Sequence, residues 1–397
     1  MKLNLKKFTF ATIFFLQGLA YGQVSNQFNI EVNRNRNVGQ SEFSAGLNQI
    51  ADQGGTLFNE FSFNTLSTIL NSFQQLNEQV KFNQRSTRLK VVTYNTALLD
   101  AFYYGIPYFD QRSYILPAKL SDLDADVIFL QEVFYEQGKS RIIDFLAAKY
   151  WAFSGIYSGH GLVILIKKSL IGNVDQKVEY LFPTQRTAET IAGYQKGCLG
   201  LKFSITNSKT PIYLVNCHLT GMLDQFEIRE SQIQELVHNL LAPIFRAPEG
   251  LLVVGGDLNG SPYYNEQSIA QQDGVNQDIP WEQLSKVYFQ FLNLFSGIDT
   301  FASFKGDVEM TDDSELWATI NRKNHLLGQS PSASEDPDQR VDFVFVRSMD
   351  QEHVLKVENA EIKLKRVYRM NRDSFEQSEL SDHYLYETEF SFGPGRL

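Results

Sequence analysis

The sequence has little cysteine, a deficit of basic residues and, after its first 22 residues, no long apolar run. Two Cys in 397 residues exclude a small scaffold held together by disulfides. Because no later segment offers about 18 consecutive apolar residues, we expect no transmembrane segment in the mature chain. Hydrophobic residues make up 43% of the chain and charged residues 21%, which predicts a globular protein with a substantial core.

The charge balance bears on the choice of partner. Lys and Arg number 36 against 46 Asp and Glu, a formal net charge of −10. Non-specific binding to DNA or RNA usually needs a basic surface, because neutralised phosphates supply most of the affinity. An acidic chain can still contain a local basic groove. Nucleic acid is nevertheless a less favoured partner than a target with less charge per unit length.

Residues 1–22, MKLNLKKFTFATIFFLQGLAYG, have the pattern of a secretory signal peptide. Three lysines precede an apolar run from Phe8 to Leu16, and Ala20 and Gly22 place small residues at the cleavage-determining positions. Nothing amphipathic favours the alternative, a short core helix. We therefore expect a secreted, extracellular protein, with the periplasm as the other destination. Cleavage would leave 33 basic and 46 acidic residues, a net charge of −13.

Residues 23–85 differ from the rest of the chain. Asn and Gln make up a third of this stretch, and apolar residues recur at helical spacing between residues 41 and 80. The pattern predicts a partly helical N-terminal extension. The interpretation we favour is that the extension only covers an exposed edge of a sheet. The alternative is a module that binds a partner.

Residues 86–397 read as an α/β domain. Several expected strands are uninterrupted apolar runs, which indicates sheets buried on both faces. Cys198 and Cys217 lie in two of these strands, and a disulfide or two buried thiols are equally compatible with the pattern. Strands are expected at 89–94, 127–130, 162–166, 199–205, 212–216, 251–254, 341–346 and 384–390, and helices at 139–150, 223–241 and 281–295.

Polar residues of catalytic type stand where these strands begin or end. Strand ends meet at one rim of a sheet, which is where α/β proteins build their sites. Six such placements are hard to explain by the needs of folding alone. They are Asn95, Gln131-Glu132, His218, Gly256-Asp257-Leu258-Asn259, Asp342 in Arg340-Val341-Asp342, and Ser381-Asp382-His383.

In this order the six groups resemble the motifs of the endonuclease/exonuclease/phosphatase superfamily, the DNase I-like fold. The resemblance covers residues 89–392. It implies a four-layered α/β sandwich of two packed mixed β-sheets flanked by helices, to which the N-terminal helical extension is added. It also implies Mg²⁺-dependent cleavage of phosphoester bonds.

The residue types agree with a metal-dependent reaction. Mg²⁺ prefers oxygen ligands and keeps several waters, so one or two carboxylates suffice. We expect Glu132 to bind the metal, Asn95 to be a direct or indirect neighbour, and Asp382 to be a second ligand or a support. The same ligands also suit Mn²⁺ or Co²⁺.

The two motif histidines have separate expected roles. His383 is the candidate general base because an imidazole titrates near neutral pH. The resemblance implies that Asp342 fixes its other ring nitrogen and that His218 binds a phosphoryl oxygen. Asp257 and Asn259 would then position the water or the leaving group and hold a phosphoryl oxygen.

Within the superfamily the chain resembles the bacterial neutral sphingomyelinase-like branch most. Lys196-Gly197 resembles a Lys-Gly pair of that branch whose Lys meets the substrate phosphate; an ordinary strand-edge Lys is the alternative. Trp317 and Asn321 are similar to an aromatic-plus-Asn insertion that contacts substrate, although the Asp that usually follows the aromatic residue is absent. A Trp that only packs in the core is the alternative.

Aromatic side chains would help such an enzyme to reach a bilayer, because Trp and Tyr favour the lipid–water interface. Candidate patches are residues 102–104 with 108–109, and residues 263–264; burial in the core is the alternative. We expect a monomeric phosphodiesterase that hydrolyses sphingomyelin or a related phospholipid at a membrane surface and releases the phospho-headgroup. The alternatives are a secreted DNase I-like nuclease and a host-interaction protein that uses the N-terminal helices.

Overall fold

The structure is a computed structural model. It describes residues 86–99, 106–155, 159–206, 210–262, 281–306, 317–321, 323–324, 326, 338–350, 353–363, 366–371 and 374–394. The expected signal peptide and the expected extension over residues 23–85 lie outside the described residues, so both stay predictions.

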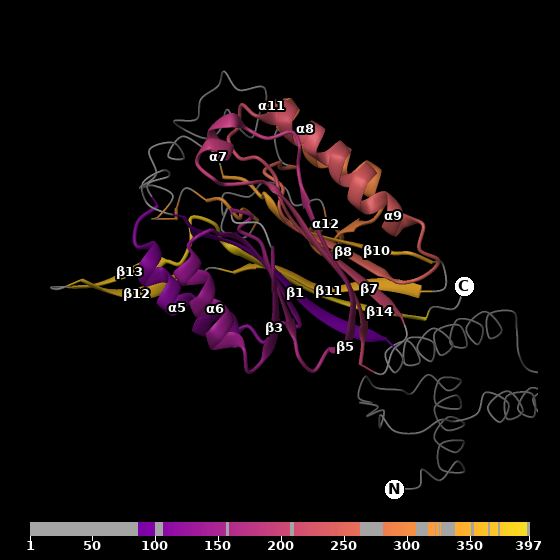
Figure 1. Cartoon of the computed structure of the whole chain (residues 1–397), viewed down its shortest axis with the longest axis horizontal. Helices are drawn as coiled ribbons and strands as arrows, with labels where there is room; N and C mark the ends of the chain where they lie inside the picture. Colours follow the sequence, from indigo (N-terminus) through magenta and orange to yellow (C-terminus); the bar gives the residue numbers. More distant parts are fainter. Residues whose placement is uncertain are drawn as a thin grey trace, which may run out of the picture. The chain divides into compact units, whose positions relative to one another are not determined.

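Two six-stranded sheets form the middle of the fold (Figure 1). In sheet A the order is β11 (His353–Lys363), β14 (Leu385–Pro394), β1 (Thr87–Leu98), β2 (Val127–Val133), β4 (Val163–Lys167) and β3 (Tyr150–Ser154). In sheet B it is β5 (Ile171–Leu181), β6 (Gly197–Ile205), β7 (Pro211–His218), β8 (Leu251–Asp257), β10 (Asp342–Ser348) and β9 (Ile298–Asp299). The pairs β1–β2 and β7–β8 are parallel and the other pairs antiparallel, so both sheets are mixed.

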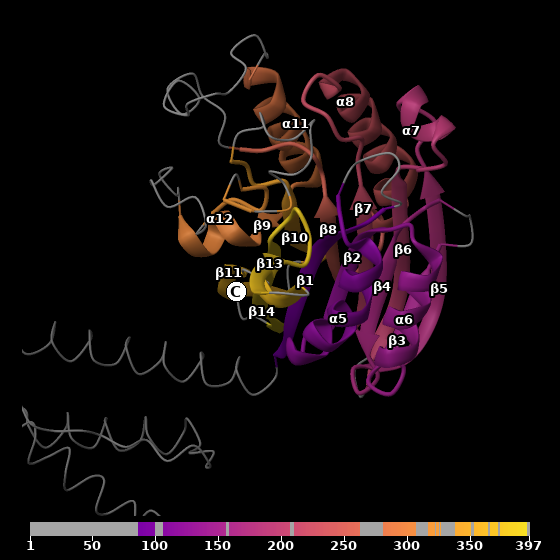
Figure 2. The same cartoon turned by 90° about the vertical axis from the view of Figure 1, so that its left-hand side faces the viewer.

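Helices cover the outer faces of both sheets (Figure 2). Leu116 and Ile142, from α5 (Phe109–Asp122) and α6 (Glu136–Leu146), pack in one cluster with residues of sheet A. On sheet B the covering elements are α8 (Phe226–Glu235), the π-helical turn η1 (Leu236–Leu241), α9 (Ala242–Phe245) and α11 (Trp281–Phe295). These layers confirm the four-layered α/β sandwich.

The third core cluster lies between the sheets. Successive residues of a strand point to opposite faces, so both faces of these strands must be apolar if both are covered. In β2, Phe129 joins the cluster between the sheets, whereas Ile128 and Leu130 pack toward α5 and α6. The uninterrupted apolar runs of the sequence therefore reflect burial on two sides.

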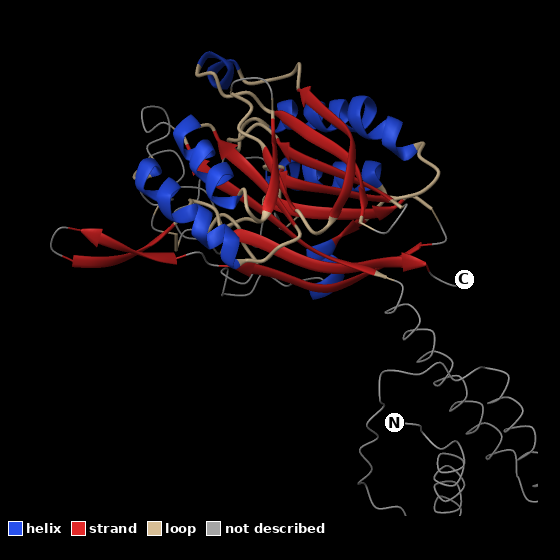
Figure 3. Cartoon of the chain, turned by 60° about the horizontal axis from the view of Figure 1, so that its bottom comes forward, coloured by secondary structure: helices blue, strands red, loops and turns tan. Residues whose placement is uncertain are grey.

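The remaining described elements are short or lie at the margins. Helices α7 (Thr187–Ile191) and α12 (Thr300–Lys305) are each a turn or two long. Strands β12 (Arg366–Asn371) and β13 (Ser374–Glu379) form a separate hairpin that extends away from both sheets (Figure 3). No helix in the described part of the chain has the length and hydrophobicity that crossing a membrane requires.

The structure corrects one sequence expectation and decides between the two alternatives of another. The helix expected at 139–150 runs over 136–146, and Tyr150 instead opens β3. Cys198 and Cys217 face each other across the β6–β7 pair and form a disulfide. Both cysteines are fully buried, and they lie close in sequence to Lys196 and His218 respectively.

Candidate active site

The polar strand ends meet where the two sheets abut. Asn95 and Glu132 come from sheet A, whereas His218, Asp257 and Asp342 come from sheet B. A cavity opens there, and the described residues that line it are Leu99, Glu132, Phe134, Glu189, Tyr194, Lys196, His218, Gly221, Met222, Asp257, Asn259 and His383. The structure thus brings most of the expected site residues into one place.

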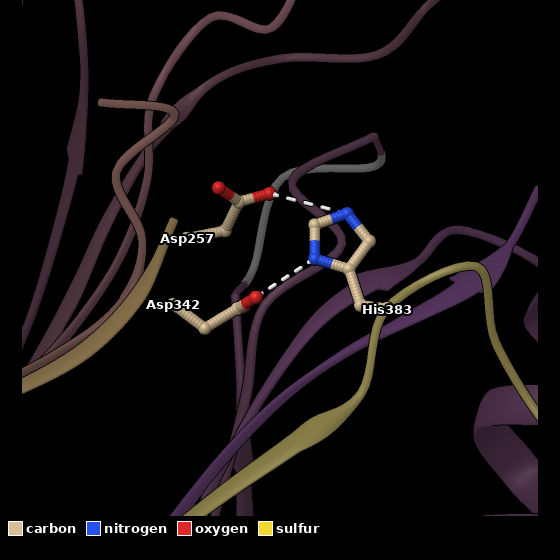
Figure 4. A group of neighbouring side chains, drawn as sticks. All are labelled: Asp257, Asp342 and His383. Carbon is tan, nitrogen blue, oxygen red and sulfur yellow. Dashed lines mark hydrogen bonds and ion pairs between the residues drawn. The ribbon is translucent and has the colours of Figure 1, made fainter. Parts of the chain in front are cut away.

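His383 stands between two carboxylates of sheet B (Figure 4). Its Nδ1 lies 2.8 Å from Asp342 Oδ2, and its Nε2 lies 4.0 Å from Asp257 Oδ2. Asp342 is fully buried at the start of β10. Asp342 therefore orients the ring and leaves Nε2 toward the cavity, which is the arrangement that a general base requires.

The charge on His383 depends on the surrounding acids. Burial lowers the pKa of His383, but Asp342, Asp382 and Asp257 together raise that pKa to about 10. Without a cation in the site, the imidazole is therefore protonated at neutral pH.

Lys196 and His218 form a second buried pair across β6 and β7. Lys196 Nζ lies 2.8 Å from His218 Nε2 and 4.0 Å from Glu132 Oε1. Burial lowers the pKa of His218, and the positive charges of Lys196 and His383 lower that pKa further. His218 is thus a neutral ring whose Nε2 accepts a hydrogen bond from the lysine, and Lys196 keeps further N–H groups for a phosphoryl oxygen. To donate to a phosphoryl oxygen from Nε2, the ring would take the tautomer that carries its proton there.

Asn95 and Asn259 fix the carboxylate of Asp257 from both sides. Asn95 Nδ2 donates to Asp257 Oδ2 at 3.0 Å, and its Oδ1 accepts from Ala97 N at 3.1 Å. The Asn95 amide therefore ties sheet A to sheet B and turns its nitrogen toward the carboxylates. Asn259 N donates to Asp257 Oδ1 at 3.0 Å, and its Nδ2 donates to Leu219 O at 3.0 Å.

The backbone at these positions is unusual. Glu132 has φ 55° and Asn259 φ 49°, both in the left-handed region that costs a side-chain-bearing residue free energy. Gly256 has φ 135°, and a Cβ there would lie 1.9 Å from Cys217 O. Strain of this kind clusters at functional sites, where the surrounding structure holds it in place.

The site contains more buried acid than base. Burial raises the pKa of Glu132 to about 7, with Asp382 and Asp257 adding to the rise and Lys196 opposing it. Burial, together with the charge of Asp342, raises the pKa of Asp257 to about 6. Asp342 Oδ1 is buried and has no hydrogen-bond partner in the structure.

These donors fit a hard divalent cation, because carboxylate oxygens are its preferred ligands and its charge would relieve their repulsion. One compact group is Asp257, Asp342 and His383, whose ligand atoms lie within 4.8 Å of one another. Within that group, however, His383 Nδ1 is already bonded to Asp342. Glu132 belongs to a different part of the cavity wall, with its side chain 16% exposed. Asp382 is half-buried and accepts a hydrogen bond from Ser381 Oγ at 3.1 Å.

Trp317 and Asn321 do not line the cavity. Trp317 is 2% exposed and packs in the cluster between the sheets, which favours the packing alternative over contact with substrate. Asn321 is fully buried, and its Oδ1 accepts from Lys323 N at 2.9 Å. Of the aromatic patches, residues 102–104 and 263–264 lie outside the described residues. Tyr108 and Phe109 are half-buried and are not part of the cavity lining.

Several residues of the site carried no sequence signal. Glu189 and Tyr194 come from α7 and the turn after it, and Phe134 follows the strand-end motif of β2.

Arg340, although part of a motif, is fully buried and pairs with Asp299 at 2.6 Å rather than facing the cavity. None of these placements follows from apolar periodicity or from strand ends.

Arg112 of α5 is another residue that the sequence pattern does not indicate. It is 4% exposed and donates to four carbonyl oxygens, those of Thr96, Ala97, Pro107 and Leu380. It thereby joins the end of β1, just after Asn95, to the segment just before His383. Its role is positional, since it does not line the cavity.

Solved structures with a similar fold belong to proteins of different kinds. TDP2 from D. rerio complexed with single strand DNA product is 18% identical, with a TM-score of 0.53, and covers 77% of this chain and 99% of its own. Beta toxin from Staphylococcus aureus is 15% identical, with a TM-score of 0.51, and covers 76% and 99%. The mannosyl-6-phosphatase Bt3783 from Bacteroides thetaiotaomicron is 14% identical, with a TM-score of 0.52, and covers 76% and 99%. At these identities the likeness concerns the fold alone.

Sequence comparison supplies the family. A search among curated proteins found no significant match. The model of the endonuclease/exonuclease/phosphatase family matches residues 93–383, which is more than half of the chain and includes every strand-end group of the site. With the two packed mixed sheets and the site at their junction, this match shows that the chain belongs to the endonuclease/exonuclease/phosphatase family, a family of phosphoesterases.

Proposed function

We propose that this chain is a secreted, Mg²⁺-dependent phosphodiesterase that hydrolyses sphingomyelin or a related phospholipid and releases the phospho-headgroup. The observation that carries the proposal is the composition of the cavity. Its lining includes Lys196, His218 and Asn259, which suit a phosphate. The lining also includes Leu99, Phe134, Tyr194 and Met222, which suit the less polar parts of a lipid headgroup region.

In this proposal Glu132 holds the cation, with Asp382 as second ligand or support and Asn95 orienting the carboxylates from behind. When bound, Mg²⁺ would neutralise charge that develops on the phosphoryl oxygens. Mn²⁺ or Co²⁺ would suit the same donors. Positive charge beside Glu132 and Asp382 would also counteract the rise in the pKa of His383 and favour its unprotonated form at neutral pH.

The chain's own groups then divide the work. His383 Nε2 removes a proton from the attacking water, while Asp342 holds Nδ1–H and stabilises the imidazolium that results. Lys196, His218 and Asn259 hold phosphoryl oxygens. Asp257 positions the water or the leaving group. The phosphorus–oxygen bond to the lipid breaks, and the phospho-headgroup leaves with the oxygen of water. The lipid oxygen takes up a proton from solvent and leaves as an alcohol, and His383 returns its proton to solvent.

A lipid is favoured over nucleic acid by charge. Lys196 is the only Lys or Arg among the described residues that line the cavity, and the whole chain has a net charge of −10. A DNA duplex or strand would bring a row of phosphates to a surface with little to neutralise them. The shared fold does not decide the matter, because one protein with this fold is in complex with a DNA product and another is a mannosyl-6-phosphatase.

The test is a side-by-side turnover assay of the purified full chain with Mg²⁺ or with EDTA, on sphingomyelin liposomes and on plasmid DNA. We expect Mg²⁺-dependent release of phosphocholine without nicking of DNA. Nicking of DNA without lipid turnover would overturn the substrate assignment and favour the nuclease alternative.

The domain division is part of the proposal: a signal peptide over residues 1–22, an accessory extension over 23–85 and a catalytic domain over 86–397. N-terminal sequencing of the exported chain tests the first boundary, with a start at Gln23 expected. A chain that begins at Arg85 should keep its turnover if the extension is accessory. Binding of a 23–85 fragment to a host partner would instead favour the host-interaction alternative.

A further inference from the structure

Beside the phosphate-binding groups the cavity contains a carboxylate that the proposed reaction does not use. Glu189 lines the cavity from α7 and is only 3% exposed. Thr220 Oγ1 donates to its Oε2 at 3.3 Å, and Lys196 Nζ lies 3.7 Å from its Oε1. Lys196 Nζ also lies 4.0 Å from Glu132 Oε1, so one ammonium group faces two carboxylates. A second cation bound beside Glu189 would balance the remaining negative charge.

Two aromatic rings that contact each other line the same cavity as Glu189. Phe134 and Tyr194 both line it, with ring centroids 4.6 Å apart and planes tilted by 44°. Gly161 makes room for Phe134, because a Cβ there would lie 2.6 Å from the ring. Tyr194 N donates to Glu189 O at 2.9 Å, which fixes the tyrosine relative to the acid.

A carboxylate next to aromatic faces is the arrangement that binds a quaternary or substituted ammonium ion, through charge and through cation–π attraction. We propose that Glu189, Phe134 and Tyr194 form a specificity subsite for the ammonium group of a phosphocholine-type headgroup. Lys196 Nζ lies 2.8 Å from His218 Nε2 and 3.7 Å from Glu189 Oε1, so the phosphate and the ammonium group would be bound next to each other. This inference rests on the proposed function and adds which part of the substrate is recognised.

The test compares the rates at which the full chain, with Mg²⁺, hydrolyses two soluble esters. One is 4-nitrophenyl phosphocholine, and the other is 4-nitrophenyl 3,3-dimethylbutyl phosphate, in which carbon replaces the ammonium nitrogen. We expect the wild type to prefer the ammonium ester. Glu189→Gln should lower kcat/KM for that ester by about 10- to 100-fold, the effect typical of losing a hydrogen bond or contact to a charged group. For the dimethylbutyl ester, kcat/KM should stay within about twofold, because this ester offers no positive charge for Glu189 to bind.

The matched control is Glu179→Gln, which makes the same change at a buried acid of β5 that lies 3.1 Å from His160 and outside the cavity lining. Glu179→Gln should leave the ratio of the kcat/KM values for the two esters unchanged. Should Glu189→Gln fail to fold, Tyr194→Leu tests the same subsite; it should reduce the preference for the ammonium ester by about fivefold through loss of the cation–π contact.

Two results would overturn the subsite while leaving the phosphodiesterase in place. An equal loss on both esters in Glu189→Gln would mean that Glu189 acts only by positioning Lys196. Equal turnover of both esters by the wild type would mean that the ammonium group is not recognised. A wild type that hydrolyses neither ester with Mg²⁺ would overturn the proposed function as well.

Discussion

At the scale of single residues, several buried carboxylates lie close together in the site. A bound cation would reduce the repulsion between them. Glu132 and Asp257 have pKa values of about 7 and about 6 because burial disfavours their charged forms. Binding of Mg²⁺ requires Glu132 to lose its proton, and the nearby positive charge favours loss of the proton from Asp257 too, so protons are released when the metal binds. The affinity for Mg²⁺ should therefore rise as the pH rises from 5 to 7 and become flat above that range.

Titration calorimetry with Mg²⁺ at pH 5.5 and 7.5 checks this prediction. With one to two protons displaced, the dissociation constant should fall at least about tenfold between the two pH values. Glu132→Gln should bind Mg²⁺ much more weakly at both pH values and lose metal-dependent turnover. An affinity independent of pH would contradict the assignment of these carboxylates.

His383 gives a second prediction at this scale. Its Nε2 faces the cavity while Asp342 holds Nδ1 at 2.8 Å. His383→Ala should lower kcat by about 10²- to 10⁴-fold, the range for a lost general base. Asp342→Asn keeps the ring and removes the charge that stabilises the imidazolium, so we expect a smaller loss. Steady-state kinetics with circular dichroism as a check on folding would measure both, and near-wild-type turnover of His383→Ala would count against its role.

The residues of the site differ in how far the sequence could predict them. Six residues stand at the ends of apolar strands, and that position alone indicates that they share one rim of the fold. They are Asn95, Glu132, His218, Asp257, Asp342 and His383. Glu189 and Tyr194 lie in and after a helix of five residues, which has too few turns to show periodicity. Trp317 shows why spacing alone does not separate two roles, because an aromatic residue in a suggestive spacing is equally well placed to fill the core, where it packs.

At the scale of elements, burial on both faces determined which strands could be recognised. Strands β5 and β11 are polar and largely half-exposed because each lies at an edge of its sheet, and no strand was predicted for either. Helix α5 was missed as well, since Pro117 and the buried Arg112 interrupt its apolar stripe. The interior strands and the helices α6, α8 and α11 follow from continuous apolar runs or from a regular stripe.

The disulfide between β6 and β7 supports a prediction about these two strands. Cys198 and Cys217 are 19 residues apart and directly opposite in the sheet. A loop of this length implies a stabilisation of about 3 kcal/mol through constraint of the unfolded chain. The Cys198→Ala/Cys217→Ala double variant should unfold at a lower denaturant concentration, and urea titration followed by fluorescence measures the loss. Unchanged stability, with thiol titration showing the cysteines paired in the wild type, would contradict it.

At the scale of the whole fold, the site depends on the distance between two sheets, and the described residues form no backbone–backbone hydrogen bond from one sheet to the other. Side chains bridge them. Gln131 Nε2 of sheet A donates to Asn216 Oδ1 of sheet B at 2.7 Å, and Asn216 Nδ2 donates back to Leu130 O and Val163 O at 2.9 and 3.0 Å. Both side chains are fully buried. The bridge therefore sets how Glu132, on sheet A, faces Lys196 and His218, on sheet B.

Asn216→Ala tests whether this bridge matters for both folding and turnover. The variant leaves Gln131 and two carbonyl groups without their buried partners, so we expect a loss of at least about 2 kcal/mol in the free energy of unfolding. We also expect kcat to fall more than KM rises, because the two halves of the site would no longer be held at one spacing. The matched control is Asn239→Ala, which removes an exposed hydrogen bond to Tyr180 and should change stability by less than about 0.5 kcal/mol. Urea unfolding and steady-state kinetics measured together decide the matter. A variant that loses stability but keeps full turnover would show that the bridge holds the sheets together without setting the geometry of the site.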